Sequence, residues 1–318
     1  MPLLALFANV FSEQSSGTTL LTERCLRRRL NTNQCKRCLD ICPSSALRLN
    51  GREIAFDETK CTGCMACVTA CPQDALVSDY DLDELLCTLQ KGRDVVVSCS
   101  RQKQNQPNEV VVPCVGIFSK QFLAAIVVNG CGPVTFNVAG CSECNNQKAS
   151  TVFFADYKLV IETLSHIVYP GLILAHQSGS SQSAGEGRRS YLLNIKENIL
   201  DVTKKSFIPD QKSPKYEKIN SRRIPHKTKL VQNLLRDLSE DSRKRILSLF
   251  GYSLSVTREC TFCPLCKGIC PTGAIKLEKS AQDKKITFKM LDCSGCGLCV
   301  EFCRKGALSL EKYPLQLS

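Results

Sequence analysis

One spacing of cysteines constrains this chain more than any other feature of its sequence. The run C-x2-C-x2-C-x3-C occurs in full from Cys61, Cys260 and Cys293, and a shortened copy begins at Cys35. Pro follows the last cysteine in three of the four runs. Three thiolates spaced in this way let one tight loop bind three corners of an iron–sulfur cube, while the fourth cysteine points away towards a second cluster. The spacing therefore predicts pairs of [4Fe–4S] clusters.

Two stretches of the chain each hold a pair of runs, and both resemble bacterial-type ferredoxin domains with two [4Fe–4S] clusters. The second stretch, residues 255–318, is the more regular, and paired ligation predicts two complete sets of thiolates there. One set is Cys260, Cys263, Cys266 and Cys303, and the other is Cys270, Cys293, Cys296 and Cys299. Arg304 stands where Pro is expected after the last run, which removes a helix-start constraint but no ligand.

The first stretch, residues 1–80, contains one complete set of thiolates and one set that lacks a member. The complete set is Cys42, Cys61, Cys64 and Cys67, and the other holds Cys35, Cys38 and Cys71. The pattern places the missing ligand at Thr32, whose hydroxyl is a poor ligand for iron. Cys25 is the nearby thiol that could replace it, and a three-iron cluster with three ligands is the alternative.

The number of cysteines also limits the class of protein. The chain has 22 Cys among its 318 residues, no Trp and three His, which leaves little material for His-based catalysis or haem ligation. Residues 1–11 lack the features of a secretion signal, so metal ligation in the reducing cytoplasm is expected. The longest apolar run, Phe122–Val128, is too short to span a membrane. A structural zinc site would show two C-x2-C pairs rather than this rhythm.

Residues 81–177 have a different pattern, in which short β-branched runs alternate with helical spacing. The expected strands are 95–99, 110–112, 134–138 and 172–175, and the expected helices are 81–90, 119–128 and 151–166. Such alternation predicts a small α/β domain with a mostly parallel sheet. The expected fold is therefore α+β, with two ferredoxin-like dicluster units that flank this α/β domain.

Three cysteines come just after expected strands of that sheet, and a fourth follows in a C-x2-C loop. They are Cys99, Cys114, Cys141 and Cys144. Because the carboxyl ends of parallel strands line one edge of a sheet, these thiols are expected to converge there. Cys87, within a helix, and Cys131, ahead of its strand, are expected to be buried structural thiols.

Residues 94–149 resemble the small delta subunit of methyl-viologen-reducing hydrogenases. The similarity lies in a strand, Cys99, the run Val112-Pro113-Cys114-Val115-Gly116, a helix, a strand and Gly140-Cys141. It implies a [2Fe–2S] cluster on Cys99, Cys114, Cys141 and Cys144, in a family that relays electrons between a hydrogenase and heterodisulfide reductase. The last pair is C-x2-C here and wider in that family. A tetrahedral zinc site and a redox dithiol at Cys141 and Cys144 are the alternatives.

Residues 178–254 are predicted to be a basic linker with helices. The Gln-, Ser- and Gly-rich stretch 177–187 is typical of a flexible linker. Residues 186–258 hold 17 Lys and Arg against 8 Asp and Glu, which accounts for most of the net charge of +12. Helical spacing is present at 227–238 and 241–250. The densest basic run is Arg222, Arg223, Lys227 and Lys229, and we expect it to face solvent and steer an acidic partner.

The sequence has no G-x-G-x-x-G loop after a strand and no other cradle for a nucleotide or flavin. We therefore predict a polyferredoxin with four [4Fe–4S] clusters and one [2Fe–2S] cluster, which carries electrons within or to an anaerobic oxidoreductase complex. The expected partners are redox proteins, such as a dehydrogenase, hydrogenase or reductase subunit. A thiol/disulfide redox enzyme or redox sensor that uses Cys141 and Cys144 is the alternative. Nucleic-acid binding is disfavoured because the basic segment lacks interleaved aromatic residues.

Overall fold

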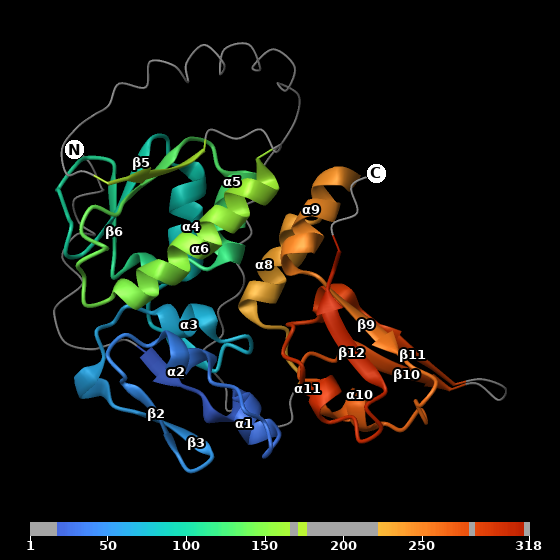
Figure 1. Ribbon diagram of the computed structural model, residues 1–318. Helices are drawn as coiled ribbons and strands as arrows, with labels where there is room; N and C mark the ends of the chain where they lie inside the picture. The colour runs from blue at the N-terminus through green and yellow to red at the C-terminus, as the bar shows by residue number, and fades with distance from the viewer. Residues whose placement is uncertain (1–17, 166–170, 177–221, 280–283, 315–318) are drawn as a thin grey trace.

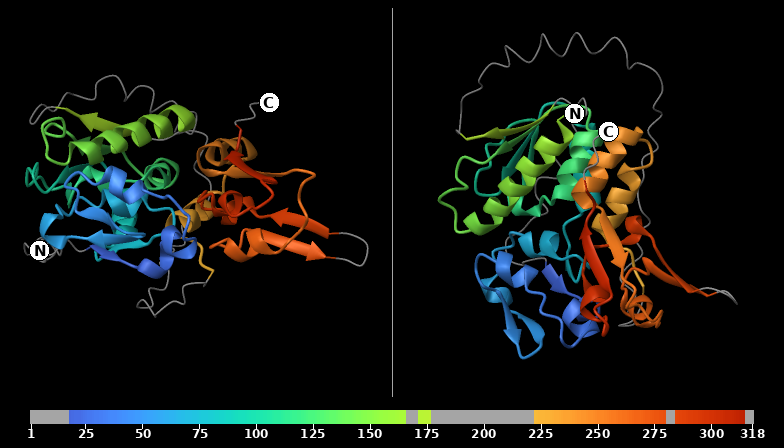
Figure 2. Two further views of the ribbon diagram at one scale, coloured as in Figure 1. Left: turned by 60° about the horizontal axis from the view of Figure 1, so that its bottom comes forward. Right: turned by 45° about the vertical axis from the view of Figure 1, so that its right-hand side comes forward.

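The computed structural model of the chain describes residues 18–165, 171–176, 222–279 and 284–314. A parallel sheet with its helices packs on one small cysteine-rich unit, and a second such unit lies beside both (Figures 1 and 2). The expected flexible linker at 177–187 and the apolar residues 1–11 lie outside the described residues. Within the described ranges, no helix combines the length and apolar composition needed to cross a bilayer.

The first unit is built from two short antiparallel strand pairs with helices between them. β1 (Thr18–Leu20) pairs with β4 (Leu76–Ser78), and β2 (Leu47–Asn50) pairs with β3 (Glu53–Phe56). Its helices are α1 (Leu26–Arg29), α2 (Arg37–Ile41) and α3 (Ala66–Ala70). Leu47 and Leu76 are buried in the same apolar core as three cysteines of this unit, so the strands supply apolar walls for the thiols.

The second unit repeats this pairing order. β9 (Tyr252–Val256) pairs with β12 (Leu308–Lys312), and β10 (Ile275–Lys279) pairs with β11 (Lys284–Phe288). Its helices are α10 (Leu265–Ile269) and α11 (Leu298–Glu301). In both units the outer strands pair with each other and the inner strands form a hairpin, as the repeated cysteine runs suggest.

The middle of the chain forms a four-stranded sheet in the order β6-β5-β7-β8, with every neighbouring pair parallel. The strands are β5 (Val95–Cys99), β6 (Glu109–Val112), β7 (Val134–Asn137) and β8 (Leu172–Ala175). The expected parallel sheet is therefore confirmed, with all four strands within one residue of their expected bounds.

Three helices cover this sheet: α4 (Leu82–Lys91), α5 (Lys120–Asn129) and α6 (Gln147–Leu164). The Asp81 carboxylate accepts the backbone N–H groups of Asp83 and Glu84, and the Ser119 hydroxyl accepts that of Phe122, which fixes where α4 and α5 begin. Helix α6 starts four residues earlier than expected, because the loop after Cys144 turns directly into it. The core between the helices and the sheet is rich in Phe side chains.

Two further helices, α8 (His226–Leu234) and α9 (Glu240–Phe250), lie within the segment expected to be a linker. Helix α8 packs against α5, and α9 packs against α6. Leu234 and Ile246 are buried in the same apolar core as the helices of the sheet. These helices are therefore part of the packed structure that joins the second unit to the middle of the chain (Figure 1).

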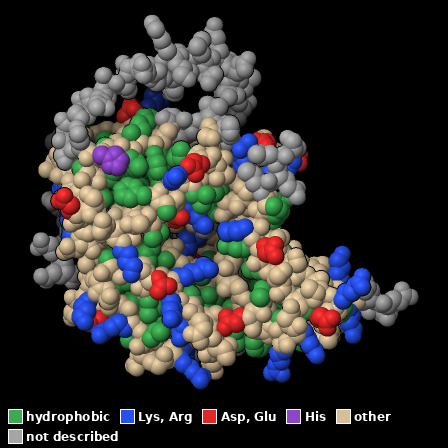
Figure 3. All heavy atoms as spheres, in the orientation of Figure 1, with side chains coloured by type: hydrophobic (Ala, Val, Ile, Leu, Met, Phe, Trp, Pro, Cys, Tyr) green, Lys and Arg blue, Asp and Glu red, His purple; other side chains and the backbone are tan. Residues whose placement is uncertain are grey.

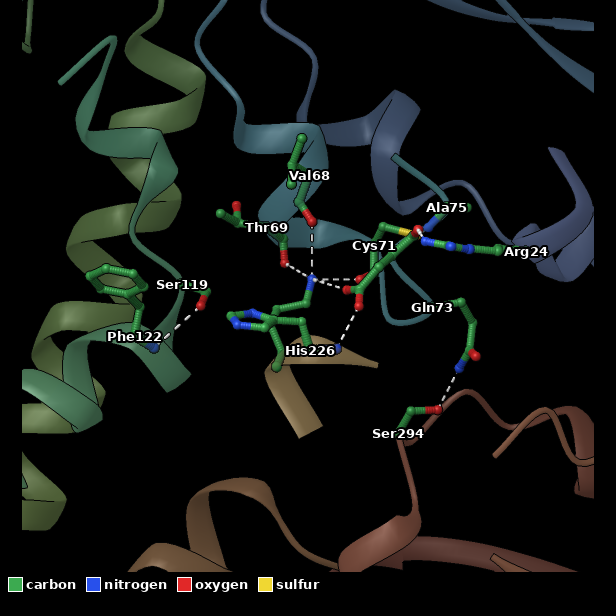
Figure 4. Close-up of polar contacts among 12 residues, drawn as sticks. Arg24, Val68, Thr69, Cys71, Gln73, Ala75, Ser119, Phe122, His226 and Ser294 are labelled. Atoms are coloured by element: carbon green, nitrogen blue, oxygen red, sulfur yellow. Dashed lines mark hydrogen bonds and ion pairs between the residues drawn. The ribbon is translucent and has the colours of Figure 1, made fainter. Parts of the chain in front are cut away.

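The basic run at the start of α8 is turned partly into the protein. The Lys227 ammonium donates to the backbone oxygens of Val68, Thr69 and Cys71, at 3.0, 2.7 and 2.5 Å (Figure 4). These carbonyls lie at the C-terminal end of α3, where a helix leaves its last carbonyls without partners. The expectation that the run faces solvent is therefore wrong for Lys227, whose side chain is 14% exposed.

Asp74, in the loop after Cys71, makes a second contact with the start of α8. Its carboxylate accepts the backbone N–H of His226 at 2.6 Å, at the start of α8, and both terminal nitrogens of Arg223 at 3.3 Å. The expectation of a solvent-facing side chain is thus also wrong for Arg223, whereas Arg222 and Lys229 are exposed. The start of α8 and the loop after Cys71 therefore hold each other through buried charged groups.

A titratable contact reinforces this junction. His226 Nε2 lies 2.7 Å from an oxygen of Asp83, and this hydrogen bond raises the pKa of His226 above its usual 6.5 even though burial opposes it. The contribution of this contact to folding stability is therefore fully present below about pH 6.5 and is lost as the pH rises through the raised pKa. Because both side chains are partly exposed, we expect this contribution to be less than about 1 kcal/mol.

We predict that His226→Gln lowers the hydrogen-exchange protection of α8 amides at pH 6, with a difference from wild type that shrinks above neutral pH. His176→Gln is the matched control, because His176 is exposed. Hydrogen exchange by mass spectrometry at pH 6 and pH 8.5 would measure both variants. A loss of protection that is the same at both pH values would show that the ion pair contributes nothing.

Candidate iron–sulfur sites

Each cysteine run begins after the same local turn. The backbone N–H of Cys61, Cys260 and Cys293 donates to the carbonyl oxygen three residues earlier, at 3.1, 3.2 and 3.0 Å. Cys25 makes this bond to Thr22 at 3.1 Å, and a 3-10 turn directly precedes it, as one precedes Cys61 and Cys293. Cys25 therefore stands where the first cysteine of a run stands in the other copies.

An insertion separates Cys25 from the rest of its run. Nine residues lie between Cys25 and Cys35, whereas two lie between Cys260 and Cys263. Helix α1 lies within the insertion, and Arg29 at its end donates to the backbone oxygen of Ile269 in the second unit at 2.8 Å. The extra residues therefore hide the regular spacing in the sequence and provide a contact between the two units.

The cysteine loops curl back so that backbone N–H groups face sulfur. Gly63, Phe262 and Gly295, each two residues after the first cysteine of a run, have φ values of 64°, 53° and 65°. The N–H groups of Phe262 and Gly295 donate to the sulfur of Cys260 and Cys293, both at 3.4 Å. A Cβ at Gly295 would also meet the Tyr252 ring at 2.2 Å, so this position requires glycine. Hydrogen bonds of this kind suit thiolates that hold a cluster.

In the first unit the thiols fall into two groups. We call Cys25, Cys35, Cys38 and Cys71 the Cys25 group, and Cys42, Cys61, Cys64 and Cys67 the Cys61 group. Burial and then the neighbouring charges of Cys71, Cys35 and Cys25 raise the pKa of Cys38 to about 12. Burial followed by Cys64, Cys61 and Cys42 raises the pKa of Cys67. The structure thus brings Cys25 into the set that lacks a cysteine at position 32.

In the second unit the same division appears. We call Cys260, Cys263, Cys266 and Cys303 the Cys260 group, and Cys270, Cys293, Cys296 and Cys299 the Cys293 group. Burial, and then Cys296, Cys293 and Cys270, raise the pKa of Cys299 to about 12. Burial raises the pKa of Cys266, where Cys263 and Cys260 are the neighbouring charges, and Cys303 packs on the apolar cluster that contains Cys266.

The thiols at the carboxyl edge of the sheet also converge. Burial first, and then the charges of Cys64, Cys99 and Cys141, raise the pKa of Cys114 to about 12. Burial, and then the charges of Cys99 and Cys144, raise the pKa of Cys141 to about 11. We call Cys99, Cys114, Cys141 and Cys144 the sheet-edge group, and the prediction that they come together agrees with the structure.

The sheet-edge group accepts hydrogen bonds at sulfur, as the cysteine loops do. Backbone N–H groups of Gly116 and Asn146 donate to Cys114 and Cys144 at 3.5 and 3.4 Å, and Arg101 approaches the Cys144 sulfur at 3.6 Å. Two backbone N–H groups and one guanidinium thus face these sulfur atoms, as is expected around the thiolates of a bound metal cluster.

The remaining cysteines behave differently from these groups. Cys131 is exposed, so the expectation that it is a buried structural thiol is wrong, because the loop ahead of β7 leaves it at the surface. Cys87 is half-buried on α4. No three His, Cys, Asp or Glu side chains in the described part of the chain lie close enough to share one metal ion. Thiolates that bind different iron atoms of one cluster lie farther apart than the ligands of a single metal ion.

The thiol groups lie beside one another both between the sheet and the first unit and within the first unit. Cys114 of the sheet-edge group lies beside Cys64 of the Cys61 group, and a Cβ on Gly116 would meet the Cys64 carbonyl at 3.2 Å. Within the first unit, Cys38 of the Cys25 group contributes to the raised pKa of Cys67 in the Cys61 group.

The Cys25 group in turn faces the Cys293 group across the two units. Gln73, two residues after Cys71, donates to the Ser294 hydroxyl at 2.5 Å (Figure 4). The guanidinium of Arg29 lies near the thiols of Cys270 and Cys296. Within the second unit, Cys266 of the Cys260 group and Cys299 of the Cys293 group lie in one apolar cluster. These contacts link the five groups in one series, in the order Cys260, Cys293, Cys25, Cys61 and sheet-edge.

The contact of Lys227 and Asp74 beside Cys71 is the part of the site that the sequence did not predict. Lys227 and Asp74 lie far apart in the sequence and belong to no recognisable motif, so only the folded chain shows that they meet beside Cys71. The nearest sequence signal is Pro225, which can occupy a helix start and marks the beginning of α8.

Comparison with known families matches the model of the 4Fe-4S dicluster domain to residues 33–75 and to residues 259–307. The chain is also similar to a subunit of the ion-translocating oxidoreductase complex of Methanosarcina acetivorans, with 45% identity over 42 residues. That similarity covers 13% of this chain and 16% of the relative, a small part of either protein. No solved structure matches the chain. The two family matches indicate [4Fe–4S] clusters in both cysteine-rich units and support the prediction of a polyferredoxin.

Proposed function

We propose that this chain is an electron-transfer protein in which all five thiol groups hold iron–sulfur clusters. The observation that carries the proposal is the single series of groups, since contacts link each group to the next across three packed parts of the chain. Clusters of this kind accept and release single electrons. The protein itself supplies spacing, apolar burial and hydrogen bonds to sulfur, which set the potential.

We assign one [4Fe–4S] cluster to each of the Cys25, Cys61, Cys293 and Cys260 groups, and one [2Fe–2S] cluster to the sheet-edge group. Within this proposal the dicluster units span 1–80 and 255–318 and the α/β domain spans 81–177. Residues 178–254 contribute α8 and α9, which join them. The N–H groups directed at Cys114 and Cys144 support a cluster at the sheet edge.

We infer that the partners are redox proteins in the cytoplasm, such as a dehydrogenase, hydrogenase or reductase subunit of an anaerobic complex. The relative from Methanosarcina acetivorans is named as part of an oxidoreductase complex, which supports a partner of this kind. The Cys260 group ends the series near the surface, because Cys263 is exposed. A partner would therefore dock at this end or at the sheet edge.

The alternative, a redox dithiol at Cys141 and Cys144, finds less support. A nucleophilic thiol has a lowered pKa and is accessible. Cys141 is buried, with 8% of its surface exposed, and its pKa is raised.

The cluster assignment predicts the metal content of the chain. Four cubes and one binuclear centre correspond to about eighteen iron atoms per anaerobically purified chain, with matching acid-labile sulfide. Elemental analysis and a sulfide assay would measure both. About sixteen iron atoms with one zinc would place zinc at the sheet edge instead. Zinc throughout would contradict the proposal.

The assignment of Cys25 predicts a selective effect. Cys25→Ser is expected to lose the Cys25-group cube or convert it to a three-iron cluster, while the other clusters stay intact, as seen by EPR during stepwise reduction. Cys87→Ser is the matched control, and its spectrum should equal that of wild type. An unchanged spectrum in Cys25→Ser would show that this group natively holds three ligands.

Cluster ligation also predicts which thiols react. In the anaerobic holoprotein, Cys141 and Cys144 should resist iodoacetamide, while the exposed Cys131 is alkylated quickly. Peptide mass spectrometry after short labelling would compare the three. Rapid alkylation of Cys141 with all iron retained would favour the dithiol instead.

A further inference from the structure

A basic cavity of about 50 Å³ lies where α5, α8 and the second cysteine-rich unit meet. Three lysines from three elements line it: Lys120 at the start of α5, Lys227 at the start of α8 and Lys312 at the end of β12. Among the described residues that line the cavity, none is Asp or Glu. Figure 3 shows Lys and Arg side chains around a hollow near the middle of this face.

Two of these lysines are fixed in place without full neutralisation. Lys312 donates to the backbone oxygen of Leu249 at 3.1 Å, and its ammonium lies 4.3 Å from the centre of the Tyr252 ring. Lys227 donates to three backbone oxygens, and Asp74, at 3.9 Å, also serves Arg223. Backbone carbonyls and a ring face orient an ammonium but carry no net charge, so positive charge remains at the cavity.

Lys120 is the least satisfied of the three. Its ammonium forms no hydrogen bond and no ion pair with another described residue. Burial, and then the charge of Lys312, lower its pKa, and Asp156 is the acid that acts against this. Arg37 adds a further positive charge that acts on all three lysines. Gathering so many like charges in a partly buried place is costly unless an anion joins them.

We propose that this cavity binds a phosphate group, held by Lys120 and Lys312, while Lys227, whose three N–H groups already bond to backbone oxygens, adds only its charge. Lysine binds phosphate as a point charge, and the positive end of the α5 dipole lies at the same place. Thr228 and Ser294 add hydroxyl groups to the lining. Pockets for larger ligands measure about 300–1,000 Å³, so a cavity of this size holds one small group and no nucleoside.

Binding at this position would join two parts of the chain. Lys120 belongs to the α/β domain and Lys312 to the second unit, so one anion would link them and would lie beside Cys293, which also lines the cavity. The competing explanation is that the lysines only balance the negative charge of the clusters. Measurements on the cluster-loaded protein distinguish the two, because the cluster charges are then already present.

The test is calorimetric titration of the anaerobic holoprotein with inorganic phosphate, in buffer free of phosphate and sulfate. We expect saturable binding at one site, and Lys120→Gln is expected to weaken it by roughly tenfold or more at equal iron content. Lys229→Gln, an exposed position on the same helix α8, is the matched control and should bind as wild type does. Lys120→Arg, which keeps the charge, should retain binding.

No phosphate binding by the wild-type holoprotein would overturn the proposal and leave the lysines as counter-charges for the clusters. Equal affinity in Lys120→Gln and wild type would also overturn it, because phosphate would then bind elsewhere. Titration with AMP separates two sources of the group. Weaker binding of AMP than of phosphate assigns the site to free phosphate, and tighter binding assigns it to a phosphate ester whose remainder lies outside the cavity. The proposal is independent of electron transfer, since binding is read directly.

Discussion

The arrangement of the whole molecule depends on buried, charged hydrogen bonds between α8 and the segment around Cys71. Lys227 caps the carbonyl end of α3, and Asp74 accepts the first N–H of α8. Burying an ammonium and a carboxylate is costly, so each must be satisfied by several partners, and here both are. Since α8 also packs on α5, this contact fixes the first unit, the sheet domain and the segment leading to the second unit relative to one another.

The sequence predicts the parts of this structure that follow from local patterns. The strands of the sheet and the helices α4 and α5 follow from β-branched runs and helical spacing, and the sheet edge on which Cys99, Cys114 and Cys141 meet follows from parallel topology. The run of cysteines predicts two dicluster units because ligand spacing is a local property of a loop.

Long-range contacts could not be predicted in this way. Lys227 appears in the sequence as one of several lysines in a charged segment, and only the fold reveals three carbonyls in reach of its ammonium. The same holds for Arg29, which reaches the second unit from an insertion that has no repeat to compare with. The sequence favours an interior place for Cys131 because free cysteines are usually buried, yet its loop lies at the surface.

The central claim is that the thiol groups form one continuous series across the two dicluster units. Pulsed EPR of the partly reduced, full-length protein tests it most directly, because two paramagnetic clusters that lie close together couple magnetically. We expect the spectrum to show coupling between a cluster of the Cys293 group and one of the Cys25 group, which disappears when Cys293→Ser removes one partner. A wild-type spectrum equal to the sum of uncoupled clusters from the two units would contradict the account.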